Sequence, residues 1–154
     1  MLGNPLMTDI TILQRYLHDH IPLSKAMEVE VVEATDDRVT LAAPLPPNIN
    51  HRETVFGGSA SAVAILSAWT LMYLRLKNEQ LNVRIVIQKN TMAYERPITG
   101  TFTASASVSD TQAWRRFVDT LKRKSRARFT VRSVLYLHAE KVGDFEGDFV
   151  AWIL

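Results

Sequence analysis

The sequence predicts an α+β protein in which a curled antiparallel sheet of about six strands surrounds one long helix. Two observations predict this class. Helical and strand-like segments follow one another in the order α, β, β, long α, β, β, short α, β, β. The long helical segment is apolar around its whole circumference, so it must be covered on every side. Consecutive antiparallel strands around one helix give a sheet folded about it.

Length and composition narrow the class further. The 154 residues fit one domain, 1–154, with residues 1–22 as an N-terminal helical extension. Cysteine is absent, which excludes disulfides, thiolate catalysis and cysteine-ligated metals and favours a cytoplasmic location. We expect no metal or cofactor, and no signal peptide opens the chain. The apolar stretch Val55–Leu76 contains glycines, hydroxyls and Arg75, so we expect a buried core helix and no membrane contact.

The first half of the chain contains one helix and two strands before the long helix. Thr8 is expected to cap a helix that runs to about His20, before Pro22, with an apolar stripe of Ile10, Leu13, Leu17 and Ile21. Alternation of apolar and charged residues predicts a strand at Met27–Val31. A polar turn and a second strand, Val39–Ala43, follow.

The long helix is expected from Gly57 to about residue 77. Strand patterns follow it at Val83–Tyr94, Thr101–Ser109, Ala127–His138 and Phe145–Ile153. Between the second and third of these lies a helix, Thr111–Lys124, with Asp110 as its cap and an inner face of Trp114, Phe117, Val118 and Leu121. An open sheet has two unpaired edges, which favours a homodimer or a higher homo-oligomer.

The segment before the long helix carries the candidate chemistry. It reads Asn48-Ile49-Asn50-His51-Arg52-Glu53-Thr54-Val55-Phe56-Gly57-Gly58. Two glycines at a helix start let another group approach the backbone, where the first N–H groups lack helical partners. Such an end stabilises an oxyanion or enolate. The alternative is that the glycines only permit close packing of helix against strand.

The element order and the spacing Asn50-x6-Gly57-Gly58 resemble the hotdog fold of acyl-thioester enzymes, whose loop often reads N-x-x-G-x-x-H-G-G. The resemblance covers about residues 24–153. It implies that the Gly58 backbone amide binds the thioester oxygen and that Asn50 faces the acyl group. Asn50 and Gly58 are therefore the catalytic candidates, and Asn48, otherwise a loop-capping residue, is the second choice.

The loop also departs from the family pattern. Glu53 replaces its usual glycine, Phe56 its frequent histidine, and Ile65 the acid that commonly lies on the helix. No acid occurs between Thr54 and Asn78. Because hydrolysis in this fold normally needs a carboxylate as nucleophile or base, simple thioester hydrolysis is disfavoured. Glu53 is the remaining candidate base if hydrolysis does occur.

Decarboxylation of a malonyl thioester needs no general base, only a polarised carbonyl and a stabilised enolate. The stretch PLPPNINHRETVFGGS resembles a bacterial hotdog domain, found alone or behind an acetyltransferase domain, that was long labelled a thioesterase and acts as malonyl-acyl carrier protein decarboxylase. The resemblance implies conversion of malonyl- to acetyl-carrier protein for fatty-acid synthesis. A short-chain acyl-carrier-protein or acyl-CoA thioesterase and a non-catalytic acyl-thioester binder remain alternatives.

Two further groups of residues are expected to bind the substrate. Around the loop, the candidates are His51, Thr54, Phe56, Gly57, Ser59 and Tyr94, for which loop, interface or packing roles are the alternative. Between Arg115 and Arg132 lie eight basic residues and one acid, although the whole chain carries only +2. An acidic carrier protein or a coenzyme A phosphate fits this segment, and its candidate ligands are Lys122, Arg123, Lys124, Arg126 and Arg128. A solvated helix face is the alternative, and no nucleic-acid motif is present.

Overall fold

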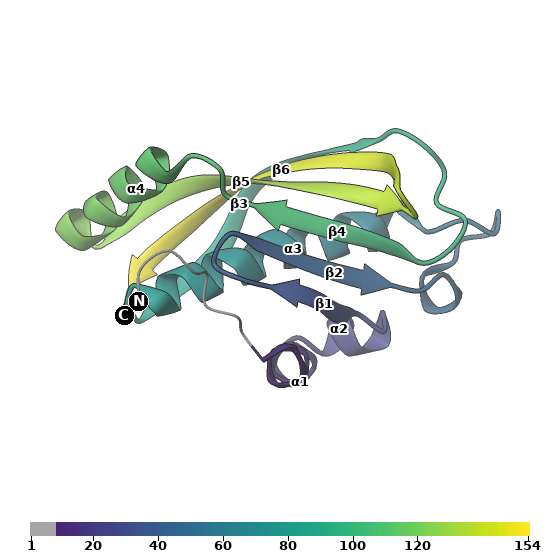
Figure 1. Cartoon of the computed structure of the whole chain (residues 1–154), viewed down its shortest axis with the longest axis horizontal. Helices are drawn as coiled ribbons and strands as arrows, with labels where there is room; N and C mark the ends of the chain where they lie inside the picture. The colour runs from purple at the N-terminus through teal and green to yellow at the C-terminus, as the bar shows by residue number, and fades with distance from the viewer. Residues whose placement is uncertain (1–8) are drawn as a thin grey trace.

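Residues 9–154 are described by a computed structural model, and they form one six-stranded antiparallel sheet around a long helix (Figure 1). The strand order is β1-β2-β4-β5-β6-β3. The strands span Glu30–Ala34 (β1), Arg38–Ala43 (β2), Val83–Tyr94 (β3), Phe102–Ser107 (β4), Arg126–Leu137 (β5) and Glu140–Ile153 (β6). The α+β class, the curled sheet, the central helix and the N-terminal helix predicted from the sequence are confirmed.

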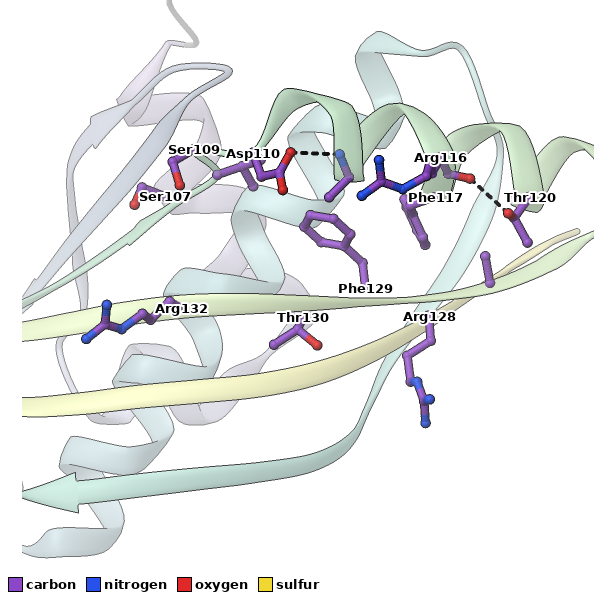
Figure 2. Close-up of a pocket in the computed structure, with 13 residues that line it drawn as sticks. Ser107, Ser109, Asp110, Arg116, Phe117, Thr120, Arg128, Phe129, Thr130 and Arg132 are labelled. Carbon is purple, nitrogen blue, oxygen red and sulfur yellow. Dashed lines mark hydrogen bonds between the residues drawn. The ribbon is translucent and has the colours of Figure 1, made fainter.

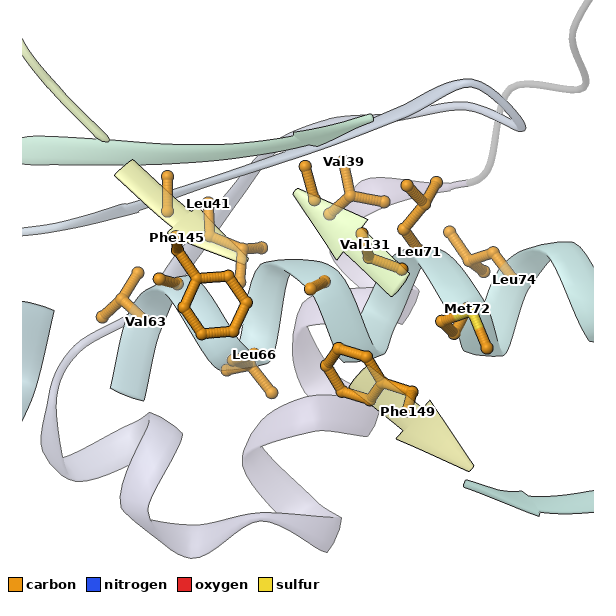
Figure 3. Packing of buried hydrophobic residues seen from close by; sticks show 14 of the residues in the cluster. Val39, Leu41, Val63, Leu66, Leu71, Met72, Leu74, Val131, Phe145 and Phe149 are labelled. Carbon is orange, nitrogen blue, oxygen red and sulfur yellow. The ribbon is translucent and has the colours of Figure 1, made fainter. Parts of the chain in front are cut away.

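The long helix α3 (Gly57–Asn78) lies in the concave face of the sheet and contacts strands β2 to β6. By length and composition α3 would pass for a membrane span, but most of it is buried inside the protein. On its sheet side, Leu66 and Met72 belong to the same buried cluster as Phe145 and Phe149 of β6 (Figure 3). The expected cover on every side is incomplete, because Ile65 and other apolar side chains on the opposite side are only partly buried.

The N-terminal helix α1 (Ile10–His20) is followed by a short helix α2 (Pro22–Ala26), which Pro22 begins. Thr8 lies outside the described residues, and the prediction that it is the cap is wrong: Asp9 accepts hydrogen bonds from the backbone N–H groups of Thr11 and Ile12. The predicted stripe is buried at Leu13 and Leu17 but exposed at Ile10. Tyr16 stacks on Tyr73 at 5.1 Å between ring centroids, which fixes α1 against α3.

The largest differences from the predicted strand boundaries are in β1, β4 and β6. Strand β1 begins three residues later than expected, because Met27 caps α2 and Glu28 adopts a left-handed φ of 57° to turn the chain. Strand β6 begins at Glu140, in a hairpin whose polar first residues break the apolar alternation. Strand β4 is shorter than predicted and ends at Ser107.

A second helix, α4 (Thr111–Lys124), connects β4 to β5, and its prediction is confirmed. Asp110 accepts a hydrogen bond from the Ala113 backbone N–H at 2.9 Å, and the predicted inner face is buried. The inner face packs on Phe129 of β5, with Trp114 meeting it edge-on at 5.2 Å. Arg75 of α3 lies 4.4 Å above the Trp114 ring, which places α4 beside the C-terminal end of α3.

Asp144 of β6 gives a pH-dependent contribution to stability. Its carboxylate accepts hydrogen bonds from Arg132 Nε at 3.0 Å and from Lys141 Nζ at 2.9 Å, and the Arg132 bond in particular lowers the Asp144 pKa. A carboxyl with a lowered pKa stabilises the fold above its unfolded pKa of about 3.9, and this contribution is lost as the pH falls through the folded pKa. We expect Asp144→Asn to lower the melting temperature at neutral pH. Melting curves of variant and parent should converge once the pH has fallen below the lowered pKa of Asp144.

Candidate active site

The loop before α3 is held by hydrogen bonds of Asn50 to its own neighbours. The Asn50 side-chain oxygen accepts from the backbone N–H of Arg52 at 2.8 Å and of Thr54 at 3.1 Å. Its amide nitrogen donates to Thr54 Oγ1 at 2.9 Å. The side chain has a second N–H, for which the described residues provide no acceptor. Asn50 thus fixes the loop and retains one free donor.

Asn48 lies deeper and has a different set of partners. It is 1% exposed, and its amide nitrogen donates to the backbone oxygens of Met27 at 3.0 Å and Pro44 at 2.8 Å. Its backbone oxygen accepts from the Phe56 N–H at 2.8 Å. Both side-chain N–H groups are therefore engaged in joining the loop to the end of α2 and to the segment after β2.

The first turn of α3 presents two backbone donors. Phe56 is the N-cap, and its backbone oxygen accepts from Ser59 N–H at 2.9 Å and Ala60 N–H at 3.1 Å. Within the described residues, the N–H groups of Gly57 and Gly58 have no acceptor, as expected for a helix start. Gly58 is exposed and lies under the Phe56 ring: a Cβ at Gly58 would come within 2.3 Å of a ring carbon.

A groove opens onto Gly58 between the start of α3 and helix α2. It has a volume of about 280 Å³ and is lined by nine residues: Leu23, Ala26, Met27, Pro47, Asn48, Phe56, Gly58, Ser59 and Ala62. None of the nine has a titratable side chain. Through Leu23, Met27 and Ala62 it continues into a second groove of about 270 Å³, whose further lining is Ile21, Ile65, Leu66 and Trp69. The space next to the Gly58 amide is therefore predominantly apolar.

A third groove, of about 330 Å³, lies on the Gly57 side of the helix start. Thr54, Gly57 and Tyr94 line it, and the Tyr94 hydroxyl donates to the Gly57 backbone oxygen at 3.2 Å. Glu95 and Arg96 also line this groove, and sequence reasoning missed both, although they directly follow Tyr94. They form ion pairs, Glu95 with Lys141 at 3.4 Å and Arg96 with Glu140 at 2.8 Å.

The structure thus divides the residues predicted from the sequence into separate groups. Asn48, Phe56, Gly58 and Ser59 share the groove beside α2, whereas Thr54, Gly57 and Tyr94 share the groove on the other side. Asn50, His51 and Glu53 line neither groove. His51 and Glu53 are exposed on the loop, and Glu53 adopts a left-handed φ of 63°.

The basic segment lies far from Gly58 within one chain. Its candidate residues are exposed and occupy the last turn of α4 and the start of β5: Lys122, Arg123, Lys124, Arg126 and Arg128. Since α4 lies beside the C-terminal end of α3, the 22 residues of that helix separate the segment from Gly58. This is about 33 Å at 1.5 Å per residue.

Solved structures of other proteins share the architecture of this chain. A protein of unknown function from Chlorobaculum tepidum TLS is 28% identical, with a TM-score of 0.88 and 94% of each chain covered. A "putative thioesterase" from Shewanella oneidensis is 25% identical, with a TM-score of 0.83 over 93% of this chain and 96% of the other. A "probable thioesterase" from Pseudomonas aeruginosa is 18% identical and shares the fold, with a TM-score of 0.80 over 96% of this chain and 99% of the other.

The thioesterase names among these structures agree with the sequence family. The profile of the family YiiD_C, described as "Putative thioesterase (yiiD_Cterm)", matches residues 10–153. That range contains both candidate grooves at the helix start, the loop and the basic segment. The chain belongs to the YiiD_C thioesterase family of hotdog-like proteins.

Proposed function

We propose that this member of an acyl-thioester enzyme family decarboxylates a malonyl thioester carried on acyl carrier protein, giving the acetyl thioester for fatty-acid synthesis. One observation supports this reaction above the others: the groove that opens onto the Gly58 N–H is lined by no titratable side chain. Hydrolysis there would lack a base to activate water. Decarboxylation needs none, and an apolar groove disfavours the charged carboxylate relative to the transition state in which its charge is dispersed.

In the proposed step, the bond between the malonyl C2 atom and its carboxylate breaks and carbon dioxide leaves. The electron pair moves into the thioester carbonyl to form an enolate, which takes a proton from water at C2. The enolate oxygen accepts a hydrogen bond from the Gly58 N–H, and the free N–H of Asn50 is the proposed second donor. Each such donor is worth about 3–4 kcal/mol when aimed at the developing charge.

Asn50→Ala is expected to abolish turnover, because it removes the proposed second donor to the enolate oxygen. The fold and the assembly should stay intact, because the hydrogen bonds lost are confined to the loop before α3. Asn50→Asp is the matched control: it keeps an oxygen acceptor for the N–H groups of Arg52 and Thr54 but removes the amide donor. Steady-state kinetics and thermal melts on both variants separate the two roles. Near-normal turnover in Asn50→Asp would leave Asn50 a positioning residue only.

A short-chain acyl-carrier-protein or acyl-CoA thioesterase is the second candidate, favoured by the family description and by the names of two similar structures. The candidate acids are then Glu95, which lines the groove on the Gly57 side, and Glu53 of the loop. Incubation with malonyl-carrier protein, read by intact-protein mass spectrometry, distinguishes the candidates. Acetyl-carrier protein supports decarboxylation, and free carrier thiol supports hydrolysis. Unchanged substrate overturns the proposed reaction and favours a non-catalytic binder.

The proposal includes a cytoplasmic homodimer joined at the free edge of β3. This strand begins at Val83, near the C-terminal end of α3, and ends at Tyr94, beside Gly57. A two-fold axis pairs it antiparallel with its copy, which brings the C-terminal end of one α3 towards the N-terminal end of the other. The basic segment of one subunit would then serve the Gly58 groove of its partner, receiving the acidic carrier protein or the coenzyme A phosphate. Light scattering tests the dimer.

A further inference from the structure

Strand β5 has an unpaired stretch in the middle of the sheet. Its 12 residues all lie along β6, but its other neighbour, β4, has only six residues and pairs with residues 132–137. The last pair is Ser107 with Arg132. The stretch Arg126–Val131 therefore has a strand on one side only, and alternate backbone N–H and C=O groups face the vacant side.

Helix α4 covers this vacancy without filling it. The chain leaves β4 at Ser107, passes through α4 and returns at Arg126, so that the helix packs on Phe129 one layer above the strand. Between α4 and the strand edge remains a cavity of about 560 Å³, with Thr120, Phe117 and Thr130 among its lining (Figure 2). A strand position is thus left open beside a helix that roofs it.

Among the described residues that line this cavity, Arg116 of α4 carries the free positive charge. Arg116 lies on α4 above β5, whereas Arg128 projects from the other side of the strand (Figure 2). Arg132 also lines the cavity but is paired with Asp144, and Arg128 donates to Gln88 Oε1 at 3.3 Å. Arg116 has no ion-pair partner among the described residues. The one acid in the lining, Asp110, is engaged in capping α4.

This placement distinguishes between two kinds of anionic ligand. A small anion needs several charged groups that converge on one point, and Arg128 does not converge with Arg116: it donates to Gln88 of β3 and so reaches across β6, away from the vacant side. In an added strand every second side chain lies on the same face, so that acidic residues in alternate positions face Arg116 on α4. Its backbone pairs with the free groups of β5, as in strand addition at other sheet edges.

We propose that the β5 edge, residues 126–131, together with Arg116 of α4, is a docking site for an extended acidic segment of a partner protein. The segment would be about six residues long, matching the unpaired stretch, or roughly 20 Å at 3.3 Å per residue. It would pass beneath α4 as a short strand beside β5. This site is separate from the Gly58 groove, and it shares Arg126 and Arg128 with the basic segment proposed to receive the carrier protein.

The probe is a labelled, end-blocked hexapeptide in which valine and glutamate alternate, added to the whole chain. Fluorescence anisotropy should show saturable binding, and hydrogen exchange should show new protection within residues 126–131. The same peptide with N-methylated backbone amides, and one with lysine in place of glutamate, should each bind at least about tenfold more weakly. Equal binding of the N-methylated peptide, or no binding of the parent peptide, overturns the proposal.

Arg116→Gln is the charge variant, and Arg123→Gln is its matched control, because Arg123 is an exposed arginine of the same helix that does not line the cavity. Arg116→Gln should weaken peptide binding about tenfold with unchanged thioester turnover, whereas Arg123→Gln should leave peptide binding intact. Equal weakening by both variants would reduce the site to non-specific charge attraction and overturn the proposal.

Discussion

Gly58→Pro is expected to reduce kcat/KM for the thioester substrate by about a hundred- to a thousand-fold, the usual cost of losing one oxyanion donor. Proline removes the N–H that we propose holds the enolate oxygen. The fold should survive, because Gly58 is the second residue of α3 and its N–H has no helical acceptor. Circular dichroism and thermal melts verify the fold, and steady-state kinetics measure the loss.

The control for this variant is Gly58→Ala. Proline and alanine both add a Cβ that meets the Phe56 ring, but alanine keeps the N–H. Phe56 is 58% exposed and can turn away into solvent. Gly58→Ala should therefore retain most of the activity that Gly58→Pro loses. If both variants lose activity equally, crowding of the groove by Phe56 explains the effect and the amide is not the donor.

The largest expected loss of stability is about 3–5 kcal/mol for Phe145→Ala. Phe145 is fully buried between β6 and α3 (Figure 3), so its removal leaves a cavity that the rigid helix and sheet cannot close. Chemical denaturation at matched protein concentration measures the free energy of unfolding. A loss below about 1 kcal/mol would show that the core around Phe145 repacks freely.

Gly147 gives an internal check on that prediction. A Cβ at this position would lie 2.7 Å from Phe145 Cζ and 3.1 Å from Phe149 Cε2. Both rings are buried, so Gly147→Ala alone should cost about 1–3 kcal/mol by overpacking. In the Phe145→Ala background the same change should cost less, because one of the two opposing rings is gone.

The sequence predicted the elements whose local patterns agree with their tertiary surroundings. Helix α4 is an example, since Asp110 caps it and its apolar face is the buried face. The predicted start of β1 was wrong. Met27 and Val29 are both buried and alternate with charged residues as in a strand, but Met27 lies at the end of helix α2. The predicted start of β6 was too late. The first residues of β6 are polar and lack a strand pattern, but pairing with β5 keeps them in the sheet.

The candidate site was predictable only as a location. The glycine pair identified the start of α3 correctly, but the local sequence does not determine which loop side chains face a groove. Asn48 and Asn50 look alike in sequence, yet one is buried with both N–H groups engaged and the other retains a free donor. Leu23 and Met27 reach the Gly58 groove from helix α2, a contact set by tertiary packing across more than 30 residues of chain.

The position of β3 beside β6 has a consequence for how the protein is made. Strand β3 is complete at residue 94, but its only strand neighbour within the described chain is β6, which begins at Glu140. Pairing over such a sequence separation is slow, because the entropy of closing a long loop is lost before any contact between the strands compensates for that loss. The edge proposed for dimerisation therefore forms only after the C-terminal strand has left the ribosome. Subunits should consequently associate only once β6 has been synthesised and has paired with β3.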